Sequence, residues 1–261
     1  MPFVKYQGAG NDFIIFDHLR GPVLTATDPA TIARLCDRRF GIGADGLMLL
    51  EPHPMLDFQM RYFNADGFPS SMCGNGGRCL VAYAHRLGVI ERETQFLAVD
   101  GEHRAAVIRP DWSELEMLTV SRVEDVPGGC FLHTGSPHYI RWVDDPAAVD
   151  VAGEGRVWRH HERFAPEGTN VNFVAGDLNG LTIATFERGV EAETLACGTG
   201  VTAAAIAAVR RHGAPGVFNV PVNAKGGELA VTVDYDGHAF RTILAGPAVF
   251  VFEGRYGFKW V

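Results

Sequence analysis

The feature that most constrains this chain is a cysteine set before a glycine-rich turn and an apolar helix pattern, and it occurs twice. Cys73 precedes Gly-Asn-Gly-Gly, and Cys197 precedes Gly-Thr-Gly and an alanine-rich stretch that runs to Arg211. The N–H groups and the dipole at a helix start lower the pKa of a thiol and bind a carboxylate, and glycine lets a ligand approach the backbone. Two such helix starts could hold one small carboxylic acid between a thiol that accepts a proton and a thiol that gives one.

The cysteine motif belongs to a longer repeat. The segment from Gly10 to Ile14 is similar to the segment from Gly135 to Ile140, about 125 residues later with one residue inserted. Phe63 and Phe186 are offset by 123 residues within similar segments, and the two cysteines are offset by 124. Offsets that agree this closely predict a duplicated domain.

Composition supports two ordinary globular domains. The 261 residues exceed what one core usually supports, and the 47% hydrophobic and 21% charged residues are typical of a globular chain. A net charge of −8 argues against a nucleic-acid partner. The apolar windows are too short to span a bilayer, and the N-terminus lacks a secretion signal, so we expect a cytoplasmic protein without a membrane partner. Five cysteines are an odd, sparse set, which indicates reduced thiols.

Periodicity and turn residues predict a sheet-rich α+β fold. Long helices are expected after the two cysteine turns and at 27–38, where Asp28 and Pro29 provide a cap and a first helical residue. Each half is then a curved, mostly antiparallel sheet around its own apolar helix. The expected strands are 3–7, 13–17, 47–50, 57–63, 95–99, 103–108 and 114–120 in the first half and 217–222, 229–235, 239–244 and 248–253 in the second.

Other interpretations of the same residues are weaker or remain open. Cys36, Cys79 and Cys130 are expected to be core residues. A redox pair would show Cys-x-x-Cys, and no Cys or His cluster has the spacing of a zinc site, so no metal is expected. The Gly-rich turns lack a phosphate-loop ending. From local sequence alone, Asn11, Asn64 and Asn170 suit turns or caps as well as a site, and Glu187, Arg188 and His138 suit an ordinary surface.

The motifs together resemble the diaminopimelate epimerase family, cofactor-independent enzymes of bacterial lysine and cell-wall biosynthesis. The resemblance covers essentially the whole chain, and the two cysteine signatures are its most specific part. The matching segments are Gly10–Phe13, Gly41–Asp45, Phe63–Gly67, Met72–Cys79, Gly168–Phe173, Glu187–Gly189 and Ala196–Gly200.

The resemblance implies two pseudo-symmetric domains, 1–116 completed by 249–261 and 117–248, with the site in the cleft and no cofactor. It implies that Cys73 and Cys197 are the acid and base pair that interconverts LL- and meso-2,6-diaminopimelate. His138 and Glu187 occupy places that tune the pKa of the thiols. The residues implied to bind substrate are Asn11, Asn64, Gly74, Asn75, Asn170, Glu187, Arg188, Gly198 and Thr199.

Two positions differ from the pattern of better-known members, and they leave alternatives open. Gly46 stands where a glutamine is usual, and Ser136 stands where an asparagine precedes Pro-His. An amino-acid substrate with a different distal group, such as an imidazole, is therefore one rival. A protein that only binds an amino acid is another, although it would not need two thiols. The partner expected is a small amino acid, and a homodimer is allowed.

Overall fold

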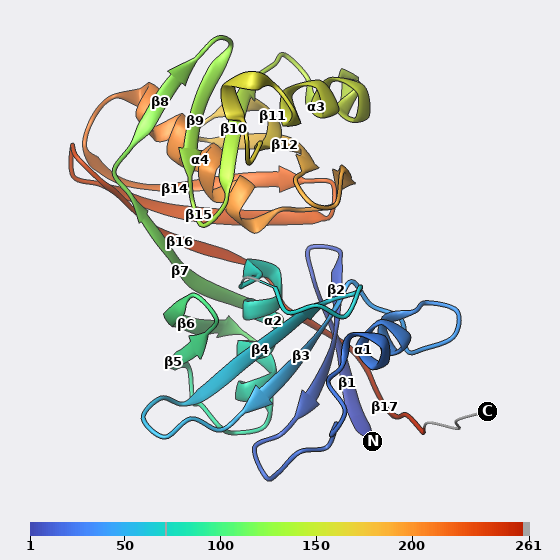
Figure 1. The fold of residues 1–261 in the computed structure, drawn as a ribbon. Coiled ribbons are helices and arrows are strands. Elements are labelled where there is room, and N and C mark those ends of the chain that lie inside the picture. The colour runs from blue at the N-terminus through green and yellow to red at the C-terminus, as the bar shows by residue number, and fades with distance from the viewer. Residues whose placement is uncertain (71, 258–261) are drawn as a thin grey trace. The chain divides into compact units, whose positions relative to one another are not determined.

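The computed structural model describes residues 1–70 and 72–257 (Figure 1). The chain divides into two compact units, Met1–Leu115 with the chain from Gly246 onward, and Glu116–Ala245. Unit 1 holds β1 (Pro2–Gly8), β2 (Asn11–Asp17), α1 (Pro29–Cys36), β3 (Gly46–Glu51), β4 (Phe58–Asn64), α2 (Gly74–Arg86), β5 (Glu93–Ala98), β6 (Gly101–Arg109) and β17 (Val249–Arg255). The chain passes between the units within β7 (Trp112–Val120) and β16 (Phe240–Pro247).

Unit 2 repeats the order of unit 1. Its elements are β8 (Val123–Val126), β9 (Gly129–His133), β10 (Pro137–Trp142), η1 (Pro146–Ala148), α3 (Val151–Arg159), η2 (Glu162–Phe164), β11 (Asn170–Asp177), β12 (Gly180–Glu187), β13 (Ala192–Thr194), α4 (Gly198–His212), β14 (Gly216–Ala224) and β15 (Gly227–Tyr235).

The strand pairing of one unit reproduces that of the other. From β1 to β6, consecutive strands pair antiparallel, parallel, antiparallel, parallel and antiparallel. The series β9, β10, β11, β12, β14 and β15 shows the same order of pairings. Because this agreement is independent of side-chain identity, the duplication predicted from the sequence is confirmed in the fold.

In each unit, two helices pack on the central strands, one helix on each face. In unit 1, Ile14, Phe16 and Leu47 pack in a core with Ile32 and Leu35 of α1. The other face of β2 and β3 packs against α2. Burial on both faces explains why β2 and β3 read as continuous apolar runs instead of alternating ones.

Unit 2 has the same two layers, with α3 in the place of α1 and α4 in the place of α2. Tyr139, Phe173 and Phe186 form a core with Val151 of α3. Helix α4 packs against β9, β10, β11, β12, β14 and β15, and Figure 1 shows it enclosed by these strands. The expectation of a sheet wrapped around an apolar helix is thus confirmed in each unit.

Helix α3 corrects the expectation that long helices occur only after the cysteines and near residue 30. The sequence does not predict this helix, because Gly153 and Gly155 lower its helix propensity. Gly155 is nevertheless required there, since a Cβ would collide with the side chain of Phe186. The parallel pairing of β10 with β11 also demands a crossover, and α3 lies within it.

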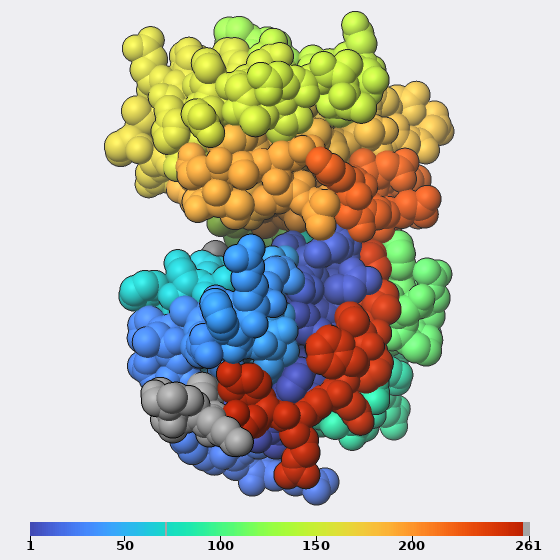
Figure 2. All heavy atoms as spheres, turned by 90° about the vertical axis from the view of Figure 1, so that its right-hand side faces the viewer, coloured from blue at the N-terminus to red at the C-terminus, as the bar shows by residue number. Residues whose placement is uncertain are grey.

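Helix ends and the last strand follow local sequence. Asp28 caps α1 by accepting from the N–H of Thr31, and Gly213 ends α4 in the left-handed conformation with φ 83°. Strand β17 pairs antiparallel with β1, and Figure 2 shows its red atoms beside the dark-blue atoms of the N-terminal segment.

Candidate active site

Both cysteines of the repeated motif stand at the N-cap of a helix. Cys73 precedes α2 and Cys197 precedes α4, each in an extended backbone conformation. Neither thiol caps its helix by a side-chain hydrogen bond. The first-turn N–H groups are therefore not taken by a capping side chain, which is the arrangement that binds a carboxylate at a helix start.

The residues beneath the two helix starts correspond by position and differ in chemistry. A Cβ added to Gly76 would lie 3.1 Å from Met48 Sδ, 3.5 Å from Phe13 Cε1 and 3.5 Å from Cys73 Cβ. A Cβ added to Gly200 in unit 2 would lie 2.5 Å from Asn172 Oδ1, 3.4 Å from His138 Cε1 and 3.4 Å from Cys197 Cβ. Phe13 and Met48 thus occupy the places of His138 and Asn172.

A buried cation lies close to Cys73. Arg78 is fully buried and donates to Asn75 Oδ1 at 2.9 Å, while its Nε has no hydrogen-bond partner within the described residues. Burial lowers the pKa of Arg78 to about 10, and its interactions with Cys79 and Cys73 act in the opposite direction. The guanidinium therefore keeps its charge at neutral pH and favours an ionised thiol at Cys73.

Asn11 and Asn75 form an amide pair at the start of α2. Asn75 donates to Asn11 Oδ1 at 2.7 Å, and Asn11 donates to Asp45 Oδ2 at 3.0 Å. Arg38 holds Asp45 in turn through a 2.7 Å ion pair. The structure thus brings two predicted substrate-binding residues together and fixes the orientation of both amides.

Gly46 is explained by its neighbour Tyr62. The register pairs Gly46 with Phe13 on one side and with Asn64 on the other, which places Asn64 at the same sheet edge as Asn11. A Cβ at Gly46 would lie 2.5 Å from Tyr62 Cε2 and 2.7 Å from the Tyr62 hydroxyl. The ring of Tyr62 therefore fills the space that a larger residue at position 46 would need.

A hydrogen-bonded chain leads to Cys197. His138 Nε2 lies 2.9 Å from Thr199 Oγ1, which in turn lies 3.4 Å from Cys197 Sγ. His138 is fully buried, and burial lowers its pKa to about 3. The imidazole is consequently neutral at physiological pH and influences the thiol through hydrogen bonds, without carrying a charge.

Asn170 is held by its surroundings and in turn positions Arg188. Its amide donates at 2.8 Å to Ser136 Oγ and at 2.8 Å to the carbonyl of Pro137, and its Oδ1 accepts from the N–H of Arg188 at 2.9 Å. Ser136 thus retains a polar contact. Within residues 1–70 and 72–257, the Arg188 guanidinium has no ion pair with a carboxylate. Glu187 ends β12 and is half-buried beside Arg188.

The other three cysteines behave as core residues, as the sequence predicted. Cys36, Cys79 and Cys130 are buried. Burial raises the pKa of Cys36 to about 12 and that of Cys130 to about 11, and it also raises the pKa of Cys79. These thiols stay protonated near neutral pH and are unsuited to proton abstraction.

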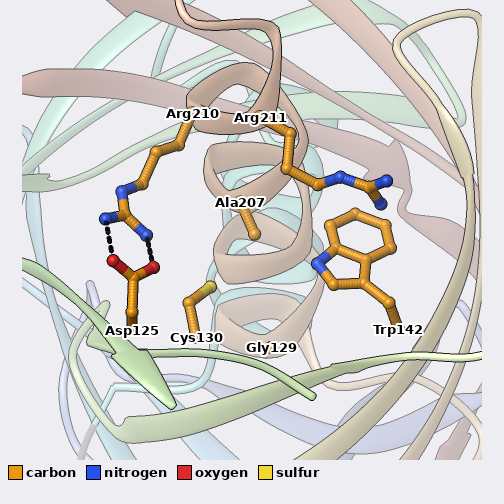
Figure 3. Close-up of a pocket in the computed structure, with 7 residues that line it drawn as sticks. All are labelled: Asp125, Gly129, Cys130, Trp142, Ala207, Arg210 and Arg211. Carbon is orange, nitrogen blue, oxygen red and sulfur yellow. Dashed lines mark hydrogen bonds and ion pairs between the residues drawn. The ribbon is translucent and has the colours of Figure 1, made fainter. Parts of the chain in front are cut away.

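A cavity of about 530 Å³ in unit 2 contains none of the predicted site residues (Figure 3). Its two arginines are engaged, because Arg210 pairs with Asp125 at 2.6 Å and Arg211 stacks over the ring of Trp142 at 4.3 Å. Its one thiol is the buried Cys130. The cavity therefore offers no group poised to accept a proton from a carbon acid.

The described part of the chain lacks two other kinds of functional feature. No helix there is both long and apolar enough to cross a membrane. Residues 1–70 and 72–257 also contain no group of three or more His, Cys, Asp or Glu side chains arranged to hold a metal ion.

Sequence reasoning missed three residues near the cysteines. Arg78 lies within the first motif, but only the structure shows that it is buried. Tyr62 contacts Gly46 through strand register. Asn172 follows Asn170 by two positions, so the period of a strand could have placed both amides on one face.

Similarity to known proteins agrees with this site. A family model described as "Diaminopimelate epimerase" matches residues 3–120 and 130–251. A diaminopimelate epimerase of Flavobacterium psychrophilum is 46% identical over 97% of this chain and 99% of the relative. One of Chlorobaculum tepidum is 43% identical over 95% of this chain and 98% of the relative.

Solved structures share the fold at low sequence identity. A PhzF-family phenazine biosynthesis protein of Bacillus anthracis superposes with a TM-score of 0.70 at 15% identity, covering 97% of this chain and 98% of that protein. A probable proline racemase of Agrobacterium radiobacter gives a TM-score of 0.68 at 17% identity, covering 99% and 93%. The solved structures show a shared fold, while the family model over both repeats and the relatives at 46% and 43% identity show that the chain belongs to the diaminopimelate epimerase family.

Proposed function

We propose that this chain is an isomerase that interconverts LL- and meso-2,6-diaminopimelate without pyridoxal phosphate. The observation that carries this proposal is the pair of equivalent N-cap thiols, Cys73 and Cys197, in a chain whose relatives at 43% and 46% identity bear the name diaminopimelate epimerase. A two-base reaction needs one proton carrier for each face of the α-carbon, and the repeat supplies two.

In the proposed mechanism, one cysteine acts as a thiolate and the other as a thiol. The thiolate removes the α-proton, and the thiol delivers its proton to the opposite face. The α-carboxylate accepts from N–H groups of Gly74 and Asn75 and of Gly198 and Thr199, which stabilises the negative charge of the intermediate. The pair carries one proton in total, and the roles exchange with direction.

Recognition of the distal end is assigned to the amides and charges around these helix starts. We infer that Arg188 binds the distal carboxylate, because its half-buried guanidinium has no carboxylate partner within residues 1–70 and 72–257. Asn11, Asn64 and Asn170 orient the polar groups, and Glu187 binds the distal ammonium. Glu187 and His138 are proposed to tune the thiols. The space beside Gly46 is filled by Tyr62, so that position does not favour a bulkier distal group.

The substrate assignment is tested by comparing turnover across amino acids under reducing conditions. Exchange of the α-proton in deuterated water is followed by NMR for diaminopimelate, histidine, lysine, glutamate and proline. We expect diaminopimelate to react fastest, and Arg188→Ala to reduce its turnover far more than that of any monocarboxylic amino acid. Faster turnover of one of the other four would leave the epimerase chemistry and remove this substrate.

Several narrower expectations stay predictions. They are a cytoplasmic location, no nucleic-acid or membrane partner, a homodimer, and domain limits of 1–116 with 249–261 and 117–248. Light scattering in solution measures the oligomeric state, and limited proteolysis locates the domain limits.

A further inference from the structure

Asn172 lies behind His138 in unit 2, and its amide orientation is fixed by its partners. Its Nδ2 lies 3.2 Å from the carbonyl oxygen of Tyr139, and its Oδ1 lies 3.0 Å from the Thr185 hydroxyl. A backbone carbonyl only accepts hydrogen bonds, so the NH₂ group of Asn172 must face Tyr139. The same NH₂ group lies 3.1 Å from His138 Nδ1.

The orientation of Asn172 determines the tautomer of His138. The amide has two hydrogens, so it donates one to the Tyr139 carbonyl and one to His138 Nδ1. Nδ1 must then be the unprotonated nitrogen of a neutral ring, and the ring hydrogen lies on Nε2. Because Nε2 is 2.9 Å from Thr199 Oγ1, the imidazole donates to the hydroxyl.

The hydroxyl of Thr199 is therefore left to donate elsewhere. It already accepts from His138, and Cys197 Sγ lies 3.4 Å from its oxygen, so its single hydrogen can be donated to the sulfur. We propose that Asn172 is a positioning residue that fixes His138 as the Nε2–H tautomer, so that Thr199 donates its hydroxyl hydrogen to the Cys197 thiolate. In this series of hydrogen bonds, Asn172 donates to His138, His138 donates to Thr199, and Thr199 donates to the sulfur.

Comparison with unit 1 shows that this series of hydrogen bonds occurs only at Cys197 and not at Cys73. The equivalent places beneath Cys73 hold Phe13 and Met48, which cannot form such a chain. Gly200 leaves the room that Asn172 needs, because a Cβ there would lie 2.5 Å from Asn172 Oδ1. The second glycine of the Cys-Gly-Thr-Gly motif, Gly200, thus leaves space for the side-chain amide of Asn172. The backbone N–H of Thr199 stays available for the carboxylate while its hydroxyl serves the thiol.

Two ionisable side chains, His133 and Arg188, act on His138, and both lower its pKa in addition to the effect of burial. The ring is fully buried, so it stays neutral over the pH range in which a cysteine titrates.

The inference rests on the proposed function only in assigning Cys197 a role in catalysis. The test therefore uses the protein without substrate. Nitrogen-15 NMR of labelled histidine, with the His138 signals assigned from His138→Phe, reports the tautomer directly. Carbon-13 NMR of cysteine labelled at Cβ, assigned with Cys197→Ser, gives the pKa of Cys197. Asn172→Met introduces the residue that unit 1 carries, and Thr199→Val removes the last donor. Thr199→Ser restores a hydroxyl.

We expect His138 to show the Nε2–H pattern in the wild type and to lose it in Asn172→Met. Asn172→Met and Thr199→Val should each raise the pKa of Cys197 by about one unit, and the double variant should add little, because either change breaks the same chain. Thr199→Ser should titrate like the wild type. Thr202→Val is the matched control, since Thr202 is buried on the same helix and bonds to the carbonyl of Gly198.

An Nδ1–H pattern in the wild type, or an unchanged Cys197 titration in Thr199→Val, would overturn the inference. If Asn172→Met does not fold, the wild-type tautomer and Thr199→Val decide the question. Diaminopimelate turnover measured in parallel separates the two proposals. An inactive protein with the Nε2–H tautomer and a shifted Cys197 contradicts only the function, whereas an active one without the shift contradicts only the role of Asn172.

Discussion

The two helix starts share one backbone and differ in the chemistry beneath it. At Cys73 the sheet presents Phe13 and Met48, and the nearby charge is the buried Arg78. At Cys197 the equivalent places hold His138 and Asn172, both uncharged at neutral pH. The same fold therefore favours one thiolate by a permanent positive charge and the other by oriented hydrogen bonds.

This difference suits a pair of thiols that exchange roles. A fixed charge acts without reorganisation, whereas a hydrogen bond from Thr199 can switch between supporting a thiolate and accepting from a thiol. The duplication thus preserved what both sites need, a thiol at a helix start that no side chain caps, and allowed the tuning groups to diverge.

The largest effect is expected from removing either thiol. Cys73→Ala and Cys197→Ala should each lower diaminopimelate epimerisation by about 10²- to 10⁴-fold or more, because each removes one proton carrier. Chirality-sensitive chromatography of the product measures the loss, and circular dichroism checks that both variants fold. Cys36→Ala is the control, since that thiol lies in the core. Near wild-type activity in either variant would show that the repeat does not supply both bases.

His138→Phe copies the residue of unit 1 and should change how stability depends on pH. Burial lowers the pKa of His138 to about 3, so the unfolded chain binds the proton first and stability falls as pH drops from about 6.5 toward 3. Between pH 7 and pH 5 this histidine should contribute a loss of about 2 kcal/mol in the free energy of unfolding. The free energy of unfolding of the His138→Phe variant should therefore fall by about 2 kcal/mol less than that of the wild type over this pH range.

Urea unfolding at the two pH values measures the difference. The control is the substitution of the exposed His238 by Phe, which makes the same change of residue outside the core. If His138→Phe and the wild type lose equal stability on acidification, His138 is not held neutral by burial.

Arg78→Met should shift the titration of Cys73 and leave that of Cys197 unchanged. Removing the buried charge should raise the pKa of Cys73 by about one unit, which corresponds to about a tenfold loss of activity below that pKa. Stability should fall by about 1–3 kcal/mol, because the buried Asn75 Oδ1 loses the donor that Arg78 supplies. The pH profile of kcat/KM and the titration of labelled cysteines measure the effect. A shift at Cys197 instead of Cys73 would contradict the division between the two sites.

Gly46→Ala should have the smallest effect. The added Cβ displaces the Tyr62 ring, so we expect KM for diaminopimelate to rise several-fold while kcat changes less. Tyr62→Leu in the same chain should recover only part of the loss, because it removes the clash with the ring while the carbonyl oxygen of Phe63 still lies 2.8 Å from the added Cβ. An unchanged KM in Gly46→Ala would show that this edge of the sheet does not touch the substrate.

The sequence predicted the parts of the structure that depend on local pattern. The two N-cap cysteines, the cap at Asp28 and the duplicated order of elements follow from turn residues and periodicity. Helix α3 did not, because its two glycines argue against a helix and are justified only by contact with Phe186 and by the N-cap at Asp150. Tertiary packing therefore stabilises α3 despite its low intrinsic helix propensity.

The site residues that lie within the sequence motifs could be predicted. Those that reach the site through the register of paired strands could not. Cys73, Asn75, Cys197 and Thr199 stand in the motifs themselves. Asn172 and Tyr62 matter because the register of β11 and β4 turns them toward a helix start, and register is a property of pairs of strands. The complete burial of Arg78 could not be read from its neighbours in sequence.

The central claim is that two different groups carry the two protons, and isotope exchange during the first turnover tests it most directly. LL-diaminopimelate is converted in deuterated water, and both isomers are analysed by mass spectrometry at low conversion. Because the thiol that delivers the proton has exchanged with solvent, we expect one deuterium in the meso product and almost none in the recovered LL substrate. Deuterium appearing equally in both isomers, or a product that retains the original hydrogen, would mean that a single base serves both faces.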